Sequence, residues 1–489
     1  MAAEPARATI ARTLFIGGSW GPAENRGSFE TSNPATGRSI GVLSEGGRAD
    51  ASRAIEAASR AAGAWGRTSP FERAGVLERI ATTIEDRRGE LARALTQDQG
   101  KPLHAEAYGE VEELIVYFRM AAADATRIEG LLPPSVDPHK RVLVYRVPKG
   151  VVGVITPWNW PYTMAAELIA PALAAGNAVV WNPARFTSHC SVALAKAIAD
   201  SGLPSGVFNL VTGPGDLVGD EIAGDPRVGV VGFVGSTRTG MRIAQRAAGK
   251  ELLMELGGNG PLVILDDADL EKAVAATITA CFLKAGQSCT AGERVLVDRA
   301  IHAEYLELLV RTVEAEVRLG DPLASSTTMG PLNNERTAAK TEHQVVEAIE
   351  RGATLHHGGR REPGLGSELF FQPTILDRVT ESMEIAREET FGPVVPITAI
   401  DGEQQALDLI ESSSYGLLTA VFTKDLGRGL RFAESAQAGW VNINEGTNYW
   451  ESHLPFGGRA GSSSGVGRVG GRFAIERLTE LKTIVVNLG

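Results

Sequence analysis

The hydrophobic positions of this chain recur in two different rhythms. Between residues 49 and 127, apolar side chains return every three or four positions, which predicts amphipathic helices. From residue 151 onwards, short apolar runs such as VVGVIT alternate with helical stretches such as TMAAELIAPALAAG. Continuous apolar strands separated by helices are typical of a parallel sheet that is covered on both faces. The pattern therefore predicts an α/β fold, in which ligands bind at the carboxyl ends of the strands.

The alternation extends further along the chain. The segments NAVVWN, GVFNLVTG, VGVVGFVGS and KELLMELGG continue the first series to residue 258. A second series begins at PLVILDDADLEKAVAATITACF and runs to about residue 442, so a second α/β unit is expected. RVLVYRVPKG (141–150) reads as an extended strand, and LTELKTIVVNL (478–488) as a strand with nothing after it to pair with. A partner subunit often covers such an edge.

Composition narrows the class of protein. A chain of 489 residues is too long for one core, so two or three domains are expected. The net charge of −11 gives no electrostatic reason to bind nucleic acid or an anionic membrane surface. The opening MAAEPARATIARTLF lacks the apolar run of a signal peptide, and no window holds the ~18 apolar residues of a spanning helix. We expect a cytoplasmic protein with neither a nucleic-acid nor a membrane partner.

The three cysteines form no Cys-x-x-Cys pair, which argues against a disulfide framework and a zinc site, and no metal is expected. Cys289 stands in KAGQSCTAGER (284–294), where small neighbours leave its sulfur accessible. Accessible thiols are candidate nucleophiles, whereas structural cysteines are embedded in apolar packing. Cys281 and Cys190 lie in apolar helical stretches and are expected to be of the packed kind.

Two glycine patterns favour a dinucleotide site. VTGPGDLVG contains Gly213-x-Gly215-x3-Gly219, one residue longer than the usual fingerprint, and a plain tight turn explains it equally well. In GFVGSTRTG, Gly235 and Ser236 follow an apolar strand and open a helix. Free backbone N–H groups and a serine N-cap there point at one spot, which suits an anion such as a pyrophosphate.

Two polar residues follow apolar strands. Asn159 lies between two tryptophans in ITPWNWP, where its amide can donate to a developing oxyanion; the alternative is an Asn that caps a turn. Glu255 ends the strand in LMELGG, where apolar surroundings should raise its pKa into the range of a general base; the alternative is a buried salt-bridge partner. With the accessible thiol, these residues describe thiol attack on a carbonyl and hydride transfer to a dinucleotide.

The sequence resembles the aldehyde dehydrogenase superfamily across nearly its whole length. The matching pieces are PWNWP, GFVGSTRTG, LMELGGNGP, GQSCTAGER, EETFGPVVP and LPFGG, in the family's order. The resemblance implies a Rossmann-like cofactor domain (1–125 and 149–257), an α/β catalytic domain (258–473) and a small β oligomerisation element (126–148 and 474–489). It also implies a small-molecule aldehyde as substrate, NAD or NADP as cofactor, and a homodimer or homotetramer.

The resemblance implies the roles of individual residues. Cys289 is the nucleophile, Asn159 and the Cys289 backbone N–H form the oxyanion hole, and Glu255 activates the water that hydrolyses the thioester. The residues implied along the dinucleotide are Thr156, Trp158, Asn182, Arg185, Gly215, Gly235, Ser236, Glu389 and Phe391.

The chain departs from the family's pattern in three places. Where the family reads Lys-Pro-(Ser/Ala)-Glu, this chain reads Asn182 to Arg185. The missing glutamate would have bound the ribose hydroxyls and repelled a 2′-phosphate, whereas a guanidinium suits phosphate geometry. We therefore expect NADP to be accepted, with a slight lean towards it; a solvated Arg185 is the alternative. Val469, after a longer loop following Phe456, stands where the family usually has a proton-relay acid. Glu167 and Leu168 stand where many relatives carry a basic residue, on the helix after PWNWP.

The same resemblance implies a substrate mouth, which it builds from Trp160, Tyr162, Ser288, Thr290, Trp450 and His453. Tyr162 and Trp450 can form an aromatic wall for an apolar or arylic aldehyde; plain packing is the alternative. No arginine lies in these segments to pair a substrate carboxylate, although Arg294 is close in sequence.

Two rival functions remain open. A CoA-acylating aldehyde dehydrogenase generally lacks a base at the position of Glu255, so the presence of this residue favours hydrolysis. A catalytically idle, structural or binding member of the fold is disfavoured because Cys289, Asn159 and Glu255 are all retained.

Overall fold

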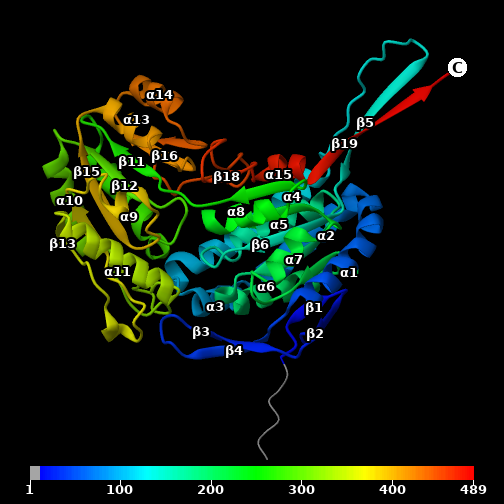
Figure 1. The fold of residues 1–489 in the computed structure, drawn as a ribbon, viewed down its shortest axis with the longest axis horizontal. Coiled ribbons are helices and arrows are strands. Elements are labelled where there is room, and N and C mark those ends of the chain that lie inside the picture. Colours follow the sequence, from blue (N-terminus) through cyan, green and yellow to red (C-terminus); the bar gives the residue numbers. More distant parts are fainter. Residues whose placement is uncertain (1–10) are drawn as a thin grey trace, which may run out of the picture.

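The computed structural model describes residues 11–489, and within them two open sheets stand next to each other, each flanked by helices (Figure 1). Residues 1–10 lie outside the described part, and with them most of the opening segment in which no signal peptide was expected. No helix among the described residues combines the length and the apolar character needed to cross a membrane.

The first sheet has eight strands within the described residues, and its central strands are parallel. In spatial order its strands are β18 (Gly465–Val466), β10 (Glu251–Glu255), β9 (Val228–Val234), β6 (Val151–Thr156), β7 (Ala178–Pro183), β8 (Phe208–Leu210), β1 (Leu14–Ile16) and β2 (Ser19–Gly21). All residues of β6 and β7 are buried, as the continuous apolar runs predicted.

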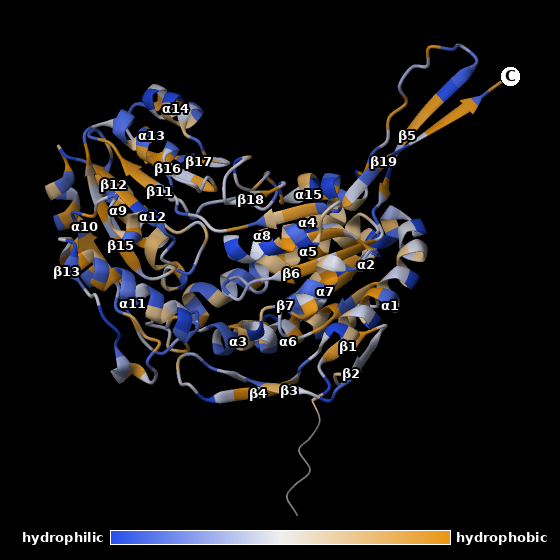
Figure 2. Cartoon of the chain, in the orientation of Figure 1, coloured by the Kyte–Doolittle hydropathy of each residue, from blue (hydrophilic) through white to orange (hydrophobic). Residues whose placement is uncertain are grey.

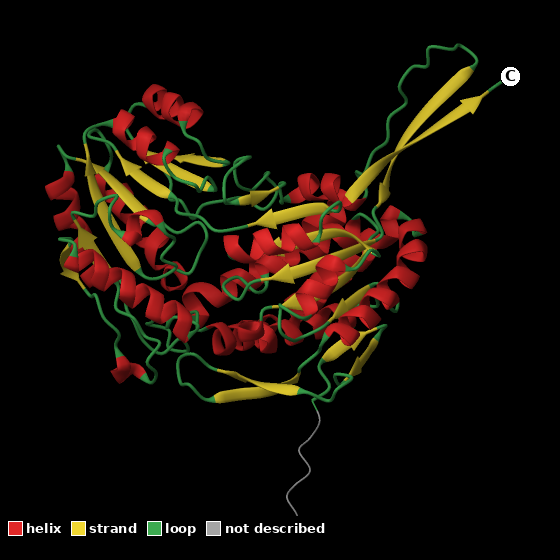
Figure 3. Cartoon of the chain, in the orientation of Figure 1, coloured by secondary structure: helices red, strands yellow, loops and turns green. Residues whose placement is uncertain are grey.

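Helices cover both faces of this sheet (Figure 3). They are α1 (Arg48–Arg67), α2 (Pro70–Asp86), α3 (Arg88–Gln99), the π-helix η1 (Leu103–Ala107), α4 (Tyr108–Ala125), α5 (Thr163–Ala174), the 3₁₀ turn η2 (Arg185–Thr187), α6 (Ser188–Ala199), α7 (Val218–Gly224), α8 (Thr237–Arg246) and α15 (Gly471–Leu478). Local chemistry sets their ends. For example, Ser69 caps α2 by accepting from the N–H of Phe71 while the Glu72 carboxylate accepts from the N–H of Ser69.

The second sheet is parallel except at the edge strand β13, and it confirms the second α/β unit that the sequence predicted. In spatial order its strands are β13 (Thr354–His357), β14 (Thr374–Asp377), β15 (Val394–Ile400), β12 (Arg294–Asp298), β11 (Pro261–Ile264), β16 (Leu418–Phe422) and β17 (Trp440–Ile443). Its helical segments are α9 (Leu270–Phe282), η3 (Leu283–Gly286), α10 (His302–Glu316), α11 (Glu335–Glu350), η4 (Pro363–Leu365), α12 (Glu384–Arg387), α13 (Glu403–Glu411) and α14 (Leu426–Ser435).

Two small two-stranded sheets complete the fold. Strands β3 (Ser28–Ser32) and β4 (Ser39–Ser44) pair locally, while β5 (Lys140–Pro148) pairs with the distant β19 (Thr479–Asn487). The last strand therefore does have a partner much earlier in the chain, because Thr479 pairs with Pro148 and Asn487 with Lys140, and the two strands form a ribbon that projects from the body (Figure 1). Apolar residues lie along this ribbon and in the interior strands of both sheets (Figure 2).

Candidate active site

A cleft of about 360 Å³ opens where the carboxyl ends of β6, β7, β9 and β10 meet. All nine residues expected along a dinucleotide line it: Thr156, Trp158, Asn182, Arg185, Gly215, Gly235, Ser236, Glu389 and Phe391. Asn159, Glu255 and Cys289 line the same cleft. The candidate chemistry and the candidate cofactor residues, which come from distant parts of the sequence, are therefore brought to one place.

Cys289 is the only one of the three cysteines that is not fully buried within the described chain. Its loop follows an unusual backbone, because Lys284 and Ala285 have φ values of 52° and 54°, in the left-handed region that non-glycine residues avoid. Desolvation, helped by the Glu389 carboxylate, raises the pKa of the Cys289 thiol to about 12, while the nearby Lys284 lowers it. The free thiol is thus protonated at neutral pH and needs a proton acceptor or a bound cation to become a nucleophile.

The oxyanion donor lies against the loop of the nucleophile. The Asn159 side-chain amide donates to the carbonyl of Gln287, two residues before Cys289, over 3.0 Å. An amide has two N–H groups, so one remains for a ligand. The backbone N–H of Cys289 has no acceptor among the described residues. These two donors therefore form a suitable pair for an oxyanion.

Asn159 is fixed from behind by a contact that sequence reasoning missed. The buried Lys101 donates to the Asn159 carbonyl over 3.4 Å and forms an ion pair with Glu110. Glu110 in turn accepts from the N–H groups of Tyr162 and Thr163. Lys101 lies between α3 and η1 in the polar segment TQDQGKPLHAE, so no local pattern indicates this contact.

Glu255 ends β10 and is only 2% exposed, and neither of its carboxylate oxygens has a hydrogen-bond partner. Desolvation, and then the charge of Glu167, raise the pKa of Glu255 well above its ordinary value, and Arg468 opposes them. Glu255 forms no salt bridge in the described chain. The alternative role, a buried salt-bridge partner, therefore has no support in the structure. An unpartnered carboxyl beside a cleft has the properties of a general base.

The segment that joins the two sheets touches the nucleophile's loop. Gly257 and Gly258 lie between β10 and β11, and a Cβ on Gly258 would overlap the Cys289 carbonyl oxygen. Ser464 donates to the Gly257 carbonyl over 2.7 Å, and Glu389 accepts from the Gly258 N–H over 3.0 Å. Only glycine permits this approach.

The cleft fits a dinucleotide at both of its ends. Ser236 caps α8 by accepting from the Thr239 N–H, and the first turn of this helix faces the cleft, where an anion is stabilised. A Cβ on Gly235 would lie 2.7 Å from the ring of Phe233, so a side chain there would disturb this corner. A Cβ on Gly215 would lie 4.0 Å from the Asn182 Oδ1, an ordinary van der Waals contact.

The opposite end is formed by Glu389 and Phe391. Burial raises the pKa of Glu389 to about 7, and Phe391, at φ 60°, stands edge-on to Trp158 with ring centroids 5.5 Å apart. Sequence reasoning missed the residue that holds this segment. Glu293, four positions after Cys289, accepts from the N–H groups of Thr390 and Phe391 over 2.7 and 2.9 Å.

The residues that depart from the family's pattern also have defined places. Asn182 donates to the Val211 carbonyl over 2.9 Å, which ties β7 to the loop after β8. Arg185 forms an ion pair with Glu45 over 2.6 Å and stacks on Phe29. Val469 is buried, and its backbone N–H and C=O are both hydrogen-bonded to Phe456. The position of the usual proton-relay acid is therefore occupied by an apolar side chain.

The expected substrate residues are only partly brought together. Trp160 and Trp450 meet edge to face with centroids 5.6 Å apart, and Ser288 and Thr290 are buried and hydrogen-bonded to each other. The other two lie elsewhere. Tyr162 is completely buried and donates to the Leu91 carbonyl, and His453 is exposed beside Glu451. The structure thus places Tyr162 in the packing between α3 and α5, not in a wall of the cleft.

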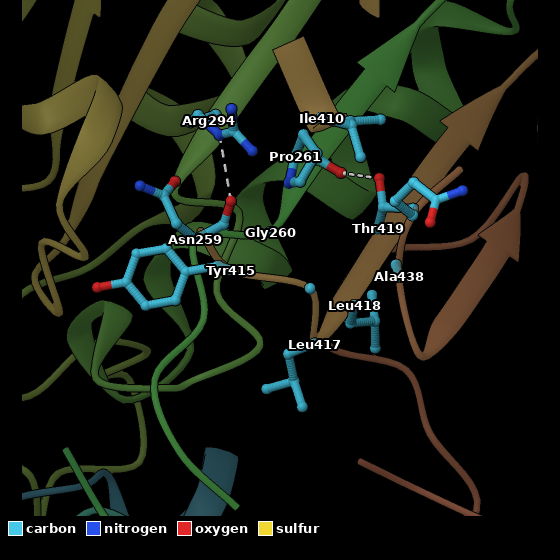
Figure 4. A pocket seen from close by; sticks show the side chains of 12 residues that line it. Asn259, Gly260, Pro261, Arg294, Ile410, Tyr415, Leu417, Leu418, Thr419 and Ala438 are labelled. Carbon is cyan, nitrogen blue, oxygen red and sulfur yellow. Dashed lines mark hydrogen bonds between the residues drawn. The ribbon is translucent and has the colours of Figure 1, made fainter. Parts of the chain in front are cut away.

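Arg294 serves the fold of the second sheet. It is 5% exposed, and its guanidinium donates to the carbonyls of Asn259 and Leu409 over 3.2 and 2.9 Å. Figure 4 shows it beside a small pocket, with the bond to Asn259 as a dashed line. Two of its donors are engaged by the backbone, and it does not line the cleft that contains Cys289.

Comparisons with known proteins agree with this geometry. The profile of the aldehyde dehydrogenase family matches residues 20–484. The chain is 38% identical over 477 residues to 3-sulfolactaldehyde dehydrogenase of Pseudomonas putida, covering 97% of each chain. It is 38% identical over 484 residues to betaine aldehyde dehydrogenase of Bacillus subtilis, covering 98% of each. A crystal structure of betaine aldehyde dehydrogenase from Staphylococcus aureus in complex with NAD+ superposes with a TM-score of 0.94 at 35% identity, covering 98% of each chain.

Proposed function

Because the chain belongs to the aldehyde dehydrogenase family, we propose that its cleft oxidises an aldehyde to the carboxylic acid with Cys289 as the nucleophile. One observation carries the assignment of the site. An accessible thiol, a free amide donor and an unpartnered carboxyl line the same cleft as the nine residues suited to a dinucleotide. The superfamily, the fold class and the enzyme class predicted from the sequence are confirmed by the family match and the solved relatives.

The first half of the reaction belongs to Cys289 and Asn159. The thiolate adds to the carbonyl carbon, and the resulting oxyanion accepts hydrogen bonds from the Asn159 amide and the Cys289 N–H. The bound dinucleotide supplies the hydride acceptor, so the thiohemiacetal becomes a thioester. Glu389 and Phe391 would hold the nicotinamide end, and Ser236 and Gly235 the pyrophosphate, in keeping with their places in the cleft.

The second half belongs to Glu255. Its ionised carboxylate takes a proton from water, and the water oxygen attacks the acyl carbon and displaces the Cys289 thiolate. The presence of this base supports hydrolysis over transfer of the acyl group to CoA. The retention of nucleophile, oxyanion donor and base in one cleft likewise counts against an idle member of the fold.

Relatives use either cofactor: one solved structure holds NAD+, and the 37% identical succinate-semialdehyde dehydrogenase of Escherichia coli is named for NADP(+). In the proposed complex Arg185 exchanges Glu45 for the 2′-phosphate, so that the cleft accepts NADP as well as NAD with a slight preference for NADP. The exposed position of Arg185 at the cleft supports this exchange.

We also propose that the chain forms a homodimer or homotetramer through the β5–β19 ribbon and works in the cytoplasm. The nine residues of β19 expose Leu481, Val485 and most of their neighbours, and an unpaired edge of this kind fits a second copy. The two sheets and this ribbon support the proposed division into a cofactor domain, a catalytic domain and an oligomerisation element, but β18 (Gly465–Val466), from the range proposed as catalytic, pairs with β10 in the first sheet. Three free thiols fit a reducing compartment.

The direct test is the absorbance of reduced dinucleotide with a panel of aldehydes and both cofactors. We expect the native enzyme to turn over and Cys289→Ala to lose at least about 1,000-fold in kcat while it still binds the dinucleotide. Cys190→Ala, which alters a buried thiol, is the matched control and should retain activity. Comparable turnover by Cys289→Ala would remove this residue as the nucleophile.

A further inference from the structure

Two segments that lead into different strands meet beside the nucleophile. Glu293 directly precedes β12, and Phe391 lies three residues before β15. These strands are parallel neighbours, with Val295 opposite Ile397, so the segments that lead into them lie at the same edge of the second sheet. One segment carries Cys289, and the other carries the two residues expected at the nicotinamide end of the cleft.

The two segments contact each other on both sides of the nucleophile in the sequence. After it, the Oε2 and Oε1 atoms of Glu293 accept from the N–H groups of Thr390 and Phe391 over 2.7 and 2.9 Å. Before it, Gly286 lies so close to Gly392 that a Cβ would overlap the Gly392 carbonyl oxygen. The loop of the nucleophile is therefore joined to the residues around Phe391 at two points.

Phe391 has a backbone conformation that needs support. Its φ of 60° lies in the left-handed region, which is unfavourable for a bulky side chain and persists only where the surroundings fix it. Glu293 is 3% exposed, and both of its carboxylate oxygens accept from this segment. Lys340 adds a further contact by donating to the Glu389 carbonyl. The buried carboxylate is thus the main polar contact that fixes Phe391.

The conformation at Phe391 decides which groups form this end of the cleft. The Phe391 ring is edge-on to Trp158, with centroids 5.5 Å apart, and both residues line the cleft together with Cys289. Glu389, two residues earlier, accepts from the Gly258 N–H over 3.0 Å. Transfer of a hydride requires close approach and alignment, so the surface that holds a nicotinamide must keep a fixed position relative to the sulfur.

We propose that Glu293 is a positioning residue for hydride transfer, because it fixes Phe391 and Glu389 relative to the nucleophile. This inference rests on the proposed function and assigns a further residue to one of its steps. Glu293 is not among the residues that line the cleft, so it acts through the segment that it holds. Hydrolysis of the thioester uses the nucleophile, Asn159 and Glu255, and none of these depends on that segment for its role. A change at Glu293 should therefore slow oxidation and spare hydrolysis.

Glu293→Gln tests the assignment with a minimal change. Glutamine has one acceptor oxygen where glutamate has two, so one of the two backbone N–H groups loses its acceptor. With the aldehyde that the native enzyme oxidises fastest, we expect the first turnover of reduced dinucleotide to slow by about tenfold or more. A deuterium isotope effect on this rate, measured with the 1-deuterated aldehyde, identifies the slowed step as hydride transfer. Glu347→Gln removes a carboxylate that accepts the Glu384 N–H outside the cleft, and as the control it should leave this rate unchanged.

Two measurements without aldehyde separate positioning from general damage to the site. Hydrolysis of 4-nitrophenyl acetate in the absence of a dinucleotide uses the nucleophile, Asn159 and Glu255 but transfers no hydride. In Glu293→Gln we expect its rate to stay within about twofold of the native rate. In calorimetric titrations, ADP-ribose, which lacks the nicotinamide, should bind the native enzyme and the variant equally. NAD+ should bind the variant several-fold more weakly than the native enzyme.

The outcomes distinguish this inference from the proposed function. An unchanged first turnover in Glu293→Gln would overturn the positioning role, and so would a loss of ester hydrolysis as large as the loss of oxidation. Equal weakening of ADP-ribose and NAD+ would also overturn it, because the effect would then not be confined to the nicotinamide end. Each of these results leaves the proposed function standing, whereas failure of the native enzyme to oxidise any aldehyde would overturn the proposed function itself.

Discussion

Glu255 faces the cleft without a hydrogen bond, and burial holds its pKa well above its ordinary value. A base acts only when it is ionised, and a raised pKa moves ionisation to higher pH. We therefore expect thioester hydrolysis to accelerate as pH rises over a range that lies above the ordinary titration range of a glutamate. Rapid-mixing measurements of the steady-state phase across this range check it, and a rate that falls with pH would contradict it.

Replacement of the same residue separates the two halves of the reaction. In Glu255→Gln, acylation remains possible and hydrolysis loses its base, so we expect one equivalent of reduced dinucleotide to form in a burst, followed by turnover slowed by about 100-fold or more. Glu251→Gln, at the other end of β10, is the control and should give normal turnover. The absence of a burst would assign Glu255 to the first half.

Arg185 carries the prediction on cofactor choice. In Arg185→Ala we expect kcat/KM for NADP to fall by about tenfold or more, because a guanidinium–phosphate contact is lost, while the value for NAD changes little. Arg60→Ala removes a comparable surface arginine that pairs with Glu56 and should alter neither value. A strong preference of the native enzyme for NAD would show that Arg185 stays with Glu45.

At the scale of single elements, the ribbon of β5 and β19 is the part with the least cover. Val485 lies in β19 and is 57% exposed. A charge there cannot be buried against a second copy, so Val485→Asp should shift the molecular mass in light scattering towards the monomer. Val42→Asp, at an exposed apolar residue of β4, is the control. An unchanged mass for Val485→Asp would place the interface elsewhere.

Elements with a strong local pattern could be predicted from the sequence, and their spatial partners could not. The apolar run of β6 requires burial on both faces, which by itself predicts a parallel sheet. Nothing local to β19 indicates that it pairs with β5, more than 300 residues away. Tyr162 shows the same limit, because the direction in which its ring points depends on how α5 packs against α3.

The residues of the site likewise divide into those that the sequence could predict and those that it could not. Glu255 and Asn159 end or follow apolar strands, so their places at the carboxyl edge of the sheet could be predicted from the pattern. The supports of the site could not, because Lys101 acts through one backbone contact and Glu293 through two, and only tertiary packing creates these contacts.

For the whole molecule, we expect several carboxyls with raised pKa values to make stability depend on pH. Burial raises the pKa to about 7 or about 8 for Asp98, Glu106, Glu113, Glu167, Glu293 and Glu389. Between about pH 4.5 and pH 8 the folded chain therefore keeps protons that the unfolded chain has released. The stabilisation is fully present below this window and is lost as pH rises through it.

We expect the free energy of unfolding to fall by at least about 2 kcal/mol across this window. Denaturant titrations at several pH values measure it, and the titrations of Glu167→Gln should show a flatter profile because one of the contributing groups is gone. A free energy of unfolding that increases with pH over the same interval would contradict the prediction.

The connection through Gly257 and Gly258, from β10 to β11, is one of two stretches of chain that join the two sheets, the other running from β17 to β18, and the backbone of Cys289 contacts it directly. A rotation of one half against the other must then carry the sulfur along. The rate at which a small alkylating reagent modifies the Cys289 sulfur should therefore report the relative orientation of the two halves. This rate should change when a ligand draws the halves together.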